Sequence, residues 1–294
     1  MSANLLATKT LNYIWHHPNS QEHKLQSISK FIGWQFYKRV TNKAVDIELV
    51  DNVKLRCHPD SYSAASVLYC GLYDYNEMNF LLRYLRPSDS FLDIGANIGV
   101  YTILAASKIK QGSIHSFEVL PKNYQRLLEN IELNHFSQIK PYQIAISDRP
   151  GKVSLNLVDG DSMAFISENS AEKSFSVEAN TIDNLLATEN TDSLTLAKID
   201  IEGAELLALK GASKLLKSKR PKVWIMEINS TISNFSHGKD DVVSLLKASE
   251  YSLYKYDAKQ NCLYSIEIEN HYDNNVLAIA DSELHFVMQR LDSE

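Results

Sequence analysis

The sequence predicts an α/β fold built on a doubly wound, mostly parallel sheet with an antiparallel edge. Residues 90–94 are short, apolar and rich in strand-forming types, and glycines and an apolar helical run follow them directly. Segments with strand and helix patterns then alternate as far as residue 228, which is typical of βαβ units. The last third of the chain is rich in strand patterns, which favours an antiparallel edge on the sheet.

Residues 1–72 are predicted to form an N-terminal extension, and residues 73–294 the main domain. Apolar side chains near helical spacing predict a helical region over residues 1–42, and residues 45–58 alternate around an Asp-Asn turn as a hairpin does. One interpretation of the helical region is a helix packed on the flank of the main domain. The other is a lid over the substrate, or an arm that joins copies into a homo-oligomer.

The remaining elements are predicted in chain order. The expected helices cover residues 76–85, 100–109, 121–135, 182–187, 204–217 and 240–249. The expected strands are 90–94, 113–118, one ending near Ile146, 152–158, 176–180, 194–201, 222–228, 252–256, 262–268 and 275–280. Residues 159–173 are polar and lack a clear period, so they are interpreted as an irregular insertion of the kind that carries specificity.

The most informative stretch is the glycine turn bracketed by Gly95 and Gly99. Glycine lets a ligand approach the backbone closely, and the amide groups of the next helix point at it. The spacing is not the G-x-G-x-x-G of dinucleotide-binding turns. Asp93, just before the turn, would repel a pyrophosphate but suits a cationic ligand with an amine, such as S-adenosylmethionine. Glu118 ends the next strand, where an acid can accept two hydrogen bonds from a ribose diol.

Charged side chains mark the strand predicted over residues 194–201. Lys198, Asp200 and Glu202 alternate to one face, where three charges are costly to bury unless they are paired or used in chemistry. The alternative interpretation is a Lys198–Asp200 ion pair, with Glu202 or Glu205 stabilising the start of the next helix.

Two further side chains are candidates for a general base. Glu227 ends the strand over 222–228 at the same rim of the sheet, although an isolated acid there is as readily a surface residue. His237 lies in a polar loop after that strand, and a histidine with an ordinary pKa of about 6.5 suits proton transfer. Against this, a lone histidine in a loop is more commonly just solvated.

Several motifs together resemble the FkbM-type S-adenosylmethionine-dependent methyltransferases. They are DIGANIGVYT (93–102), SFEVLPKN (116–123) leading to Leu127 and Asn130, AISD (145–148), KIDIEGAELLALKGA (198–212) and MEIN (226–229). Val119 departs from the family pattern, which usually has proline after the acid of the second strand. The resemblance implies a Rossmann-like class I methyltransferase fold, S-adenosylmethionine as cofactor, and methylation of a hydroxyl on a sugar, glycan or secondary metabolite.

The motifs and the resemblance together give a predicted site. The expected cofactor contacts are Tyr75, Glu77, Asp93, Gly95, Asn97, Gly99, Thr102, Glu118, Ala145 and Asp200. Tyr75 and Glu77 are included because the segment before the glycine-turn strand often covers the cofactor in this architecture. The catalytic candidates are Asp200, Glu202, Glu227 and His237. Three of these acids offer oxygen ligands for a divalent ion, but neither spacing nor resemblance requires one, so no metal is predicted.

Composition narrows the partners further. A net charge of −6 argues against a nucleic-acid backbone as the main partner. The three cysteines lack metal-binding spacing, and no apolar run approaches the roughly 20 residues of a membrane span. A cytoplasmic protein is therefore expected, and the resemblance implies that it acts on a small-molecule or glycan acceptor. Two alternatives stay open, an N-methyltransferase, for which a strong base is less necessary, and a non-catalytic protein that binds the cofactor.

Overall fold

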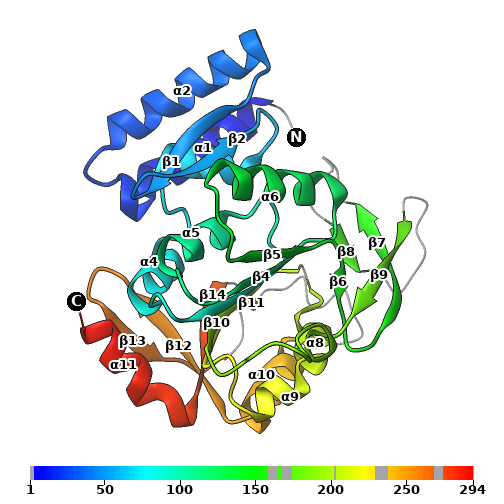
Figure 1. The fold of residues 1–294 in the computed structure, drawn as a ribbon. Helices are drawn as coiled ribbons and strands as arrows, with labels where there is room; N and C mark the ends of the chain where they lie inside the picture. Colours follow the sequence, from blue (N-terminus) through cyan, green and yellow to red (C-terminus); the bar gives the residue numbers. More distant parts are fainter. Residues whose placement is uncertain are drawn as a thin grey trace.

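The computed structural model describes residues 3–157, 164–166, 174–201, 203–228, 238–267 and 274–293. Within these ranges, eight strands form a central sheet in the order β13-β12-β14-β11-β10-β3-β4-β5 (Figure 1). The strands are β3 (Ser90–Ile94), β4 (Ile114–Phe117), β5 (Ile139–Tyr142), β10 (Leu194–Ile199), β11 (Val223–Ile228), β12 (Tyr251–Asp257), β13 (Cys262–Ser265) and β14 (Asn274–Ala280). From β5 to β11 the pairing is parallel, and from β11 to β13 it is antiparallel. The predicted sheet is confirmed.

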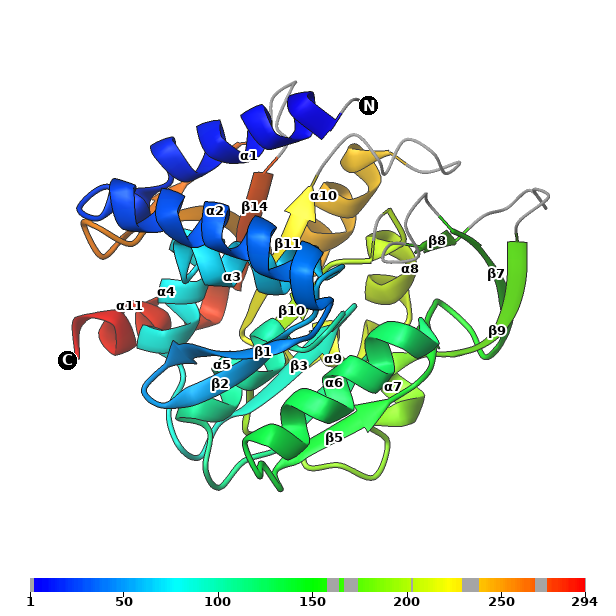
Figure 2. The same ribbon diagram turned by 90° about the horizontal axis from the view of Figure 1, so that it is seen from above.

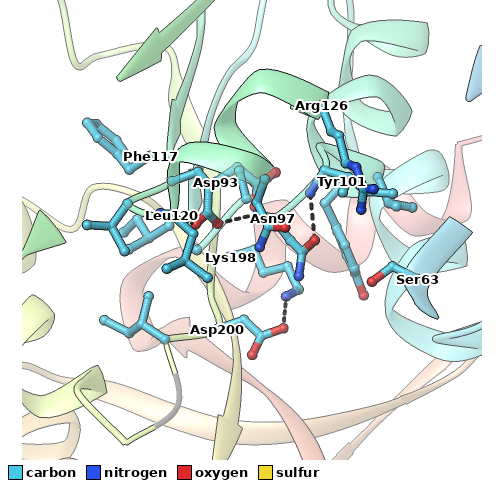
Figure 3. A pocket seen from close by; sticks show the side chains of 18 of the residues that line it. Ser63, Asp93, Asn97, Tyr101, Phe117, Leu120, Arg126, Lys198 and Asp200 are labelled. Atoms are coloured by element: carbon cyan, nitrogen blue, oxygen red, sulfur yellow. Dashed lines mark hydrogen bonds and ion pairs between the residues drawn. The ribbon is translucent and has the colours of Figure 1, made fainter. Parts of the chain in front are cut away.

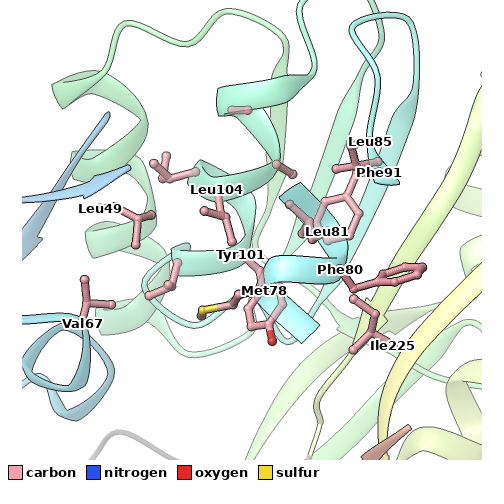
Figure 4. Close-up of a cluster of buried hydrophobic side chains, with 14 of the residues drawn as sticks. Leu49, Val67, Met78, Phe80, Leu81, Leu85, Phe91, Tyr101, Leu104 and Ile225 are labelled. Atoms are coloured by element: carbon pink, nitrogen blue, oxygen red, sulfur yellow. The ribbon is translucent and has the colours of Figure 1, made fainter. Parts of the chain in front are cut away.

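Helices cover both faces of this sheet, because successive residues of its buried strands point to opposite sides. Phe91 and Ile225 pack into one apolar core, whereas Leu92 and Trp224 pack into the other. The first core includes side chains from α4, α5 and α11, several of which are drawn in Figure 4. The helices on that side are α4 (Tyr75–Tyr84), α5 (Val100–Lys108), α6 (Pro121–Leu133) and α11 (Leu284–Asp292). Those on the other are α7 (Ile182–Leu185), α8 (Glu205–Lys210), α9 (Ser213–Lys217) and α10 (Lys239–Ala248).

The helix predicted over residues 204–217 is interrupted between α8 and α9. Gly211 lies at the break, and a Cβ atom there would sit 2.1 Å from the carbonyl oxygen of Ser147. The chain therefore bends where it touches the segment that follows β6 (Ala145–Ile146). The α11 helix at the end of the chain was not predicted. It is held by Arg290, which forms an ion pair with the buried Asp89.

The N-terminal region also differs from the single helical stretch predicted over residues 1–42. It forms α1 (Ala3–His16), a 3-10 turn (Pro18–Ser20) and α2 (Lys24–Thr41). Pro18 explains the interruption, because proline has no backbone N–H and ends the helix that precedes it. The predicted hairpin is present as β1 (Val45–Val50) and β2 (Val53–Cys57). Both residues of its Asp-Asn turn have positive φ, as type I′ hairpin turns require.

The N-terminal region packs on the main sheet's first helical layer through α3 (Tyr62–Cys70) and β2. It also fixes the segment before α4. The Tyr13 hydroxyl and Nε2 of His17 both contact the carbonyl oxygen of Tyr73, at 3.1 and 2.8 Å. Because the backbone amide of Asn19 donates to Nδ1 of His17, the hydrogen of that imidazole lies on Nε2. Residues 1–72 and 73–294 thus share contacts, and their division into two domains stays a prediction.

A second, smaller sheet lies beside β4 and β5 (Figure 2). It has the order β6-β9-β7-β8, with β7 (Gly151–Leu157), β8 (Ala164–Ile166) and β9 (Ser174–Asn180). Residues 159–173 were predicted to be irregular, but residues 164–166 form β8 and pair antiparallel with β7. The rest of that predicted insertion lies outside the described residues.

Candidate functional site

A cavity of about 610 Å³ opens at the carboxyl ends of β3, β4, β10 and β11 (Figure 3). Ligands of open α/β sheets bind at this edge. Of the residues predicted to form the site, Asp93, Gly95, Asn97, Glu118, Ala145, Asp200 and Glu227 line this cavity. Two predicted catalytic residues, Glu202 and His237, lie outside the described residues. The edge of the sheet thus brings together most of the predicted side chains from five separate segments.

Both glycines of the turn lie where a side chain would collide with neighbouring protein atoms. Gly95 has φ +82°, and a Cβ atom on it would lie 1.9 Å from the carbonyl oxygen of Asp200. Gly99 has φ +90°, and its Cβ atom would lie 2.5 Å from Cδ1 of Leu127 in α6. Both glycines are therefore required by close contact with neighbouring protein chain, while Gly95 also lines the cavity, so the approach of a ligand to it stays a prediction. Gly99 itself is not among the residues that line the cavity.

Asn130 of α6 holds the same turn from outside. Its Nδ2 donates to the carbonyl oxygen of Ile98 at 2.8 Å, and its Oδ1 accepts from the backbone amide of Arg56 at 2.7 Å. Asn130 is buried, so its two hydrogen bonds replace the water that it has lost. The cofactor turn and the N-terminal hairpin are thereby joined through one side chain.

Glu118 connects the end of β4 to the turn. Its Oε2 accepts the backbone amide of Asn97 at 2.8 Å, and its Oε1 accepts that of Leu120 at 2.7 Å. Burial raises the pKa of Glu118 to about 7, although these amides favour the charged form. The carboxyl group therefore titrates near neutral pH. A carboxylate oxygen has two lone pairs, so each oxygen can still accept a hydroxyl of a ligand.

Asp93 lies deepest in the cavity and is almost fully buried. Its Oδ2 accepts the hydroxyl of Thr102 at 2.6 Å, and that hydroxyl is 2.8 Å from Ser116. Burial raises the pKa of Asp93, opposed by the ammonium of Lys198. Thr102 is fully buried behind Asp93 and does not line the cavity. It is placed to orient Asp93 rather than to touch a cofactor.

Lys198 is the buried cation of the site. Its Nζ lies 2.6 Å from Oδ2 of Asp200 and 4.6 Å from the centre of the Tyr101 ring. Burial acts to lower the pKa of Lys198, but Asp200, Asp93 and Asp74 outweigh it and hold the pKa above its usual value. The ammonium therefore stays charged and ties three carboxylates to one place.

Both parts of the alternative interpretation of this strand are also present. Lys198 and Asp200 form the ion pair, and Glu205 accepts the backbone amide of Gly203 at 3.1 Å. Burial raises the pKa of Glu205 to about 7. Asp200 still lines the cavity, however, because its side chain is 40% exposed although it is paired with Lys198. The catalytic role of Asp200 stays a prediction.

Asp74 and Tyr101 were missed by sequence reasoning. The Tyr101 hydroxyl donates to Oδ2 of Asp74 at 2.8 Å, and both residues line the cavity beside Lys198. Burial raises the pKa of Asp74, opposed by the ammonium of Lys198. A signal existed for both: Tyr101 belongs to the glycine-turn motif, and Asp74 lies between two tyrosines just before a predicted helix.

Tyr75 and Glu77 lie outside the main cavity. They line a neighbouring cavity of about 320 Å³, which shares Tyr73, Asp74 and Asn275 with the first. From this segment, Tyr73 and Asp74, just before α4 begins at Tyr75, line the main cavity instead. Burial raises the pKa of Glu77 to about 7.

The opposite end of the cavity is apolar. Ala145 and its neighbours Ile144 and Ile146 form one side of it, with Leu120 and Leu155. At the rim, Glu227 on β11 is opposite Asn275 on β14 in the strand register, and both line the cavity. In the described part of the chain, no group of three or more His, Cys, Asp or Glu side chains is arranged to hold a metal ion. The absence of a metal requirement stays a prediction.

Comparison with known proteins gives the site its context. Hexuronic acid methyltransferase AglP of Haloferax volcanii is 26% identical over 181 residues, which cover 60% of this chain and 68% of that protein. Methyltransferase 1 of Beauveria bassiana is 27% identical over 148 residues, 42% of this chain and 59% of that relative, so the chain spans less than two thirds of its length. TYW2 of M. jannaschii in complex with AdoMet has a TM-score of 0.42 and 12% identity, covering 81% of this chain and 86% of that chain.

A family model decides the assignment. The model for the methyltransferase FkbM domain matches residues 93–256, more than half of the chain. The match begins at Asp93 and includes the glycine turn, Glu118, Lys198, Asp200 and Glu227, which are the groups brought together at the edge of the sheet. The chain therefore belongs to the FkbM methyltransferase family.

Proposed function

We propose that this protein methylates a hydroxyl oxygen of a saccharide and that Asp200 is the general base. The observation that carries the proposal is the Lys198–Asp200 pair, in which a buried ammonium holds a half-exposed carboxylate at the carboxyl end of β10. A sugar hydroxyl is a poor nucleophile at neutral pH, so a positioned base is worth roughly 10²–10⁴-fold in rate. The Haloferax volcanii relative is named a hexuronic acid methyltransferase, which supports a sugar as acceptor.

The cavity fits the cofactor at three places. Carboxylates of Asp74, Asp93 and Asp200 surround one end, which suits a ligand with a sulfonium and an ammonium group. Glu118 is positioned by two amides and keeps lone pairs for ribose hydroxyls. The apolar wall at Ala145 suits an adenine ring.

S-adenosylmethionine, when bound, supplies a methyl group made electrophilic by the positive sulfur. The chain must hold the acceptor hydroxyl in line, exclude water and remove one proton. Oδ2 of Asp200 is held by Lys198, and among the described residues Oδ1 has no hydrogen-bond partner. We assign that oxygen to the acceptor hydroxyl, whose proton moves to Asp200 as its oxygen gains the methyl group. Lys198 keeps the carboxylate oriented toward the cavity.

The neighbouring cavity supports an acceptor larger than one small alcohol. It adjoins the carboxylate end of the main cavity through Tyr73, Asp74 and Asn275. Its wall includes aromatic rings, which pack on the C–H face of a sugar, and amide and carboxyl groups that bind hydroxyls. An acceptor sugar at Asp200 therefore has room for an attached group beside Tyr75 and Glu77.

The test is methyl transfer from isotope-labelled S-adenosylmethionine to a panel of neutral glycosides, uronic acid glycosides and amino sugars. The expected product carries the methyl group on oxygen, as judged by NMR. Asp200→Asn should lower kcat by roughly 10²–10⁴-fold. It should raise the Kd for S-adenosylhomocysteine by only about threefold, because Asp74 and Asp93 still face the ammonium of this ligand, which carries no sulfonium. Asp192→Asn, at an exposed acid, is the matched control.

Each other outcome has a definite meaning. A methyl group on nitrogen would make the protein an N-methyltransferase. Binding of S-adenosylhomocysteine with no transfer to any acceptor in the panel would favour a non-catalytic protein. Full activity of Asp200→Asn would remove Asp200 as the base and leave Glu227 as the next candidate at the same rim.

A further inference from the structure

The outer side of α2 carries four apolar side chains that no described part of the chain covers. Leu25, Ile32, Phe36 and Val40 are between 60% and 79% exposed, and we call them the α2 stripe. They are seven or four residues apart, which places them on one side of the helix. Figure 1 shows α2 at the top of the molecule, away from the central sheet.

The stripe is not the side of α2 that holds the fold together. Phe31 and Trp34 provide the buried side, and they belong to the first apolar core. The helix is thus apolar on two sides, of which only one is used inside the molecule. Large apolar side chains gathered on an exposed face mark a surface that contacts another apolar body.

The charge of α2 indicates what kind of surface the α2 stripe contacts. Its charged residues are Lys24, Lys30, Lys38 and Arg39, and it has no acidic residue. The first 43 residues contain six basic residues and one acidic residue, a net charge of +5, whereas the whole chain carries −6. A basic apolar helix on an otherwise acidic protein is complementary to a surface that is both anionic and apolar just beneath.

We propose that the α2 stripe docks this protein on the surface of a bilayer that contains anionic lipids. An exposed apolar stripe flanked by Lys and Arg is the composition of helices that lie in the plane of a bilayer surface. Trp15 of α1 adds an aromatic ring that is 45% exposed, with Nζ of Lys24 4.9 Å from its centre. Such rings are favoured at bilayer surfaces. Among the described residues no helix is long and apolar enough to cross a membrane, so this attachment is peripheral.

A second copy of the chain is a poorer occupant. In a two-fold dimer the same surface appears on both subunits, so two α2 stripes would face each other. Each brings four cations and no acid, and like charges brought together oppose association. Anionic headgroups neutralise those cations instead.

The experiment is flotation of the full-length protein with vesicles of mixed phosphatidylglycerol and phosphatidylcholine, and with vesicles of phosphatidylcholine alone. The protein should float with the first and stay behind with the second. The double variant Ile32→Ser/Phe36→Ser should weaken partition by about tenfold or more, because it removes the inserted apolar area. Met288→Ser, at a half-exposed apolar residue of α11, is the matched control and should leave partition unchanged.

A charge variant separates the electrostatic contribution to vesicle binding from the contribution of the apolar side chains. Lys30→Glu/Arg39→Glu should also weaken partition, and raised salt should weaken the wild type but have little further effect on this variant. Thermal unfolding of each variant shows that the fold is kept. Failure of the wild type to float with anionic vesicles, or equal flotation of the serine double variant, would overturn the proposal. A concentration-dependent dimer that the serine variant abolishes, without vesicle binding, would assign the stripe to a second copy instead.

Discussion

The glycine turn after β3 and the rim at the ends of β10 and β11 lie at the same edge of the sheet but are built differently. In the turn, Glu118 and Asn130 bind backbone groups on its outer sides, and Gly95 leaves no space beside Asp200. At the rim, Asp200 and Glu227 are half-exposed to the cavity. The turn is fixed before any ligand arrives, whereas the rim keeps polar groups for one. The first arrangement suits a constant cofactor, and the second a specific acceptor.

Gly95→Ala is the change that should damage the turn most. The new Cβ atom would meet the Asp200 carbonyl at 1.9 Å, and the residue would be strained at φ +82°. We expect S-adenosylhomocysteine affinity to fall by about 100-fold or more, together with a lower Tm, because both the turn and the end of β10 must move. Gly33→Ala is the matched control, since no atom lies within 4 Å of its Cβ position in α2. Calorimetric titration that shows equal affinity for both variants would contradict this account of the turn.

Glu118→Gln should have the next largest effect. It removes the charge that accepts two backbone amides and, in the proposed complex, the ribose hydroxyls. We expect a Kd for S-adenosylhomocysteine about 10- to 100-fold higher, because hydrogen bonds to a charged group are each worth about 1.5–3 kcal/mol. Glu132→Gln, at an exposed acid of α6, is the control. Unchanged binding by Glu118→Gln would remove Glu118 from the cofactor site.

The pH dependence of binding sharpens the same comparison. The pKa of Glu118 is about 7 without ligand, and a ligand that donates hydrogen bonds to the carboxylate lowers that pKa. Affinity for S-adenosylhomocysteine should therefore weaken as pH falls below about 7, by up to tenfold for each pH unit if one proton is linked to binding. The Glu118→Gln variant should show a flatter profile. The range from about pH 5 to pH 8 brackets the pKa of Glu118, which is about 7. A wild-type Kd that does not change over this range would contradict the titration of Glu118.

The thermal stability of the ligand-free protein should fall as pH rises, whereas its affinity for S-adenosylhomocysteine should increase. Glu77, Glu118 and Glu205 each have a pKa of about 7 in the folded protein, raised by burial above the ordinary value of an exposed glutamate. A raised pKa contributes stability that is present below the unfolded pKa and lost as pH rises through the folded one. The Tm of the free protein should therefore decrease between about pH 5 and pH 8. A Tm that rises over that window would mean that these three groups do not outweigh His115, whose pKa burial lowers to about 4 and which acts in the opposite direction.

Tyr101→Phe should have the smallest effect of the set. It removes one hydrogen bond to Asp74 but leaves the ring that faces Lys198. We expect S-adenosylhomocysteine affinity to fall by about three- to tenfold, in line with one hydrogen bond to a charged group. Tyr37→Phe, on α2 away from the cavity, is the control. A loss as large as that of Glu118→Gln would mean that Asp74 is part of the fixed end of the site rather than of its adaptable rim.

The sequence predicts the fixed end better than the rim, and the reason is local. Asp93, Gly95 and Asn97 are close in the chain, so the geometry of a strand and a turn is enough to place them. Thr102, predicted as a cofactor contact, does not line the cavity, because its hydroxyl donates to Asp93 from behind. Tyr75 and Glu77 line the neighbouring cavity rather than the main one, and their contact with the cofactor stays a prediction.

Contacts between distant segments were not predictable from one sequence. The Asp74–Tyr101–Lys198 group joins residues from three elements, and its hydrogen bond and ring contact depend on how those elements pack. The helix breaks at Pro18 and Gly211 show one feature that can be predicted from the sequence and one that cannot. Proline is a break signal that can be read from the sequence, whereas the contact between Gly211 and Ser147 brings together segments that are far apart in the chain.

The double contact made by Asn130 has a consequence for how this chain tolerates change. Its amide binds the backbone, not the side chains, of Arg56 and Ile98. The residue types at those two positions can therefore vary while the connection persists, and the constraint falls on position 130 alone. A foreign segment that replaces the first 72 residues keeps the hydrogen bond to Oδ1 of Asn130 if its hairpin places a backbone N–H where that of Arg56 lies. Whether a transplanted N-terminal segment fits the rest of this chain thus depends more on its backbone register than on its sequence similarity.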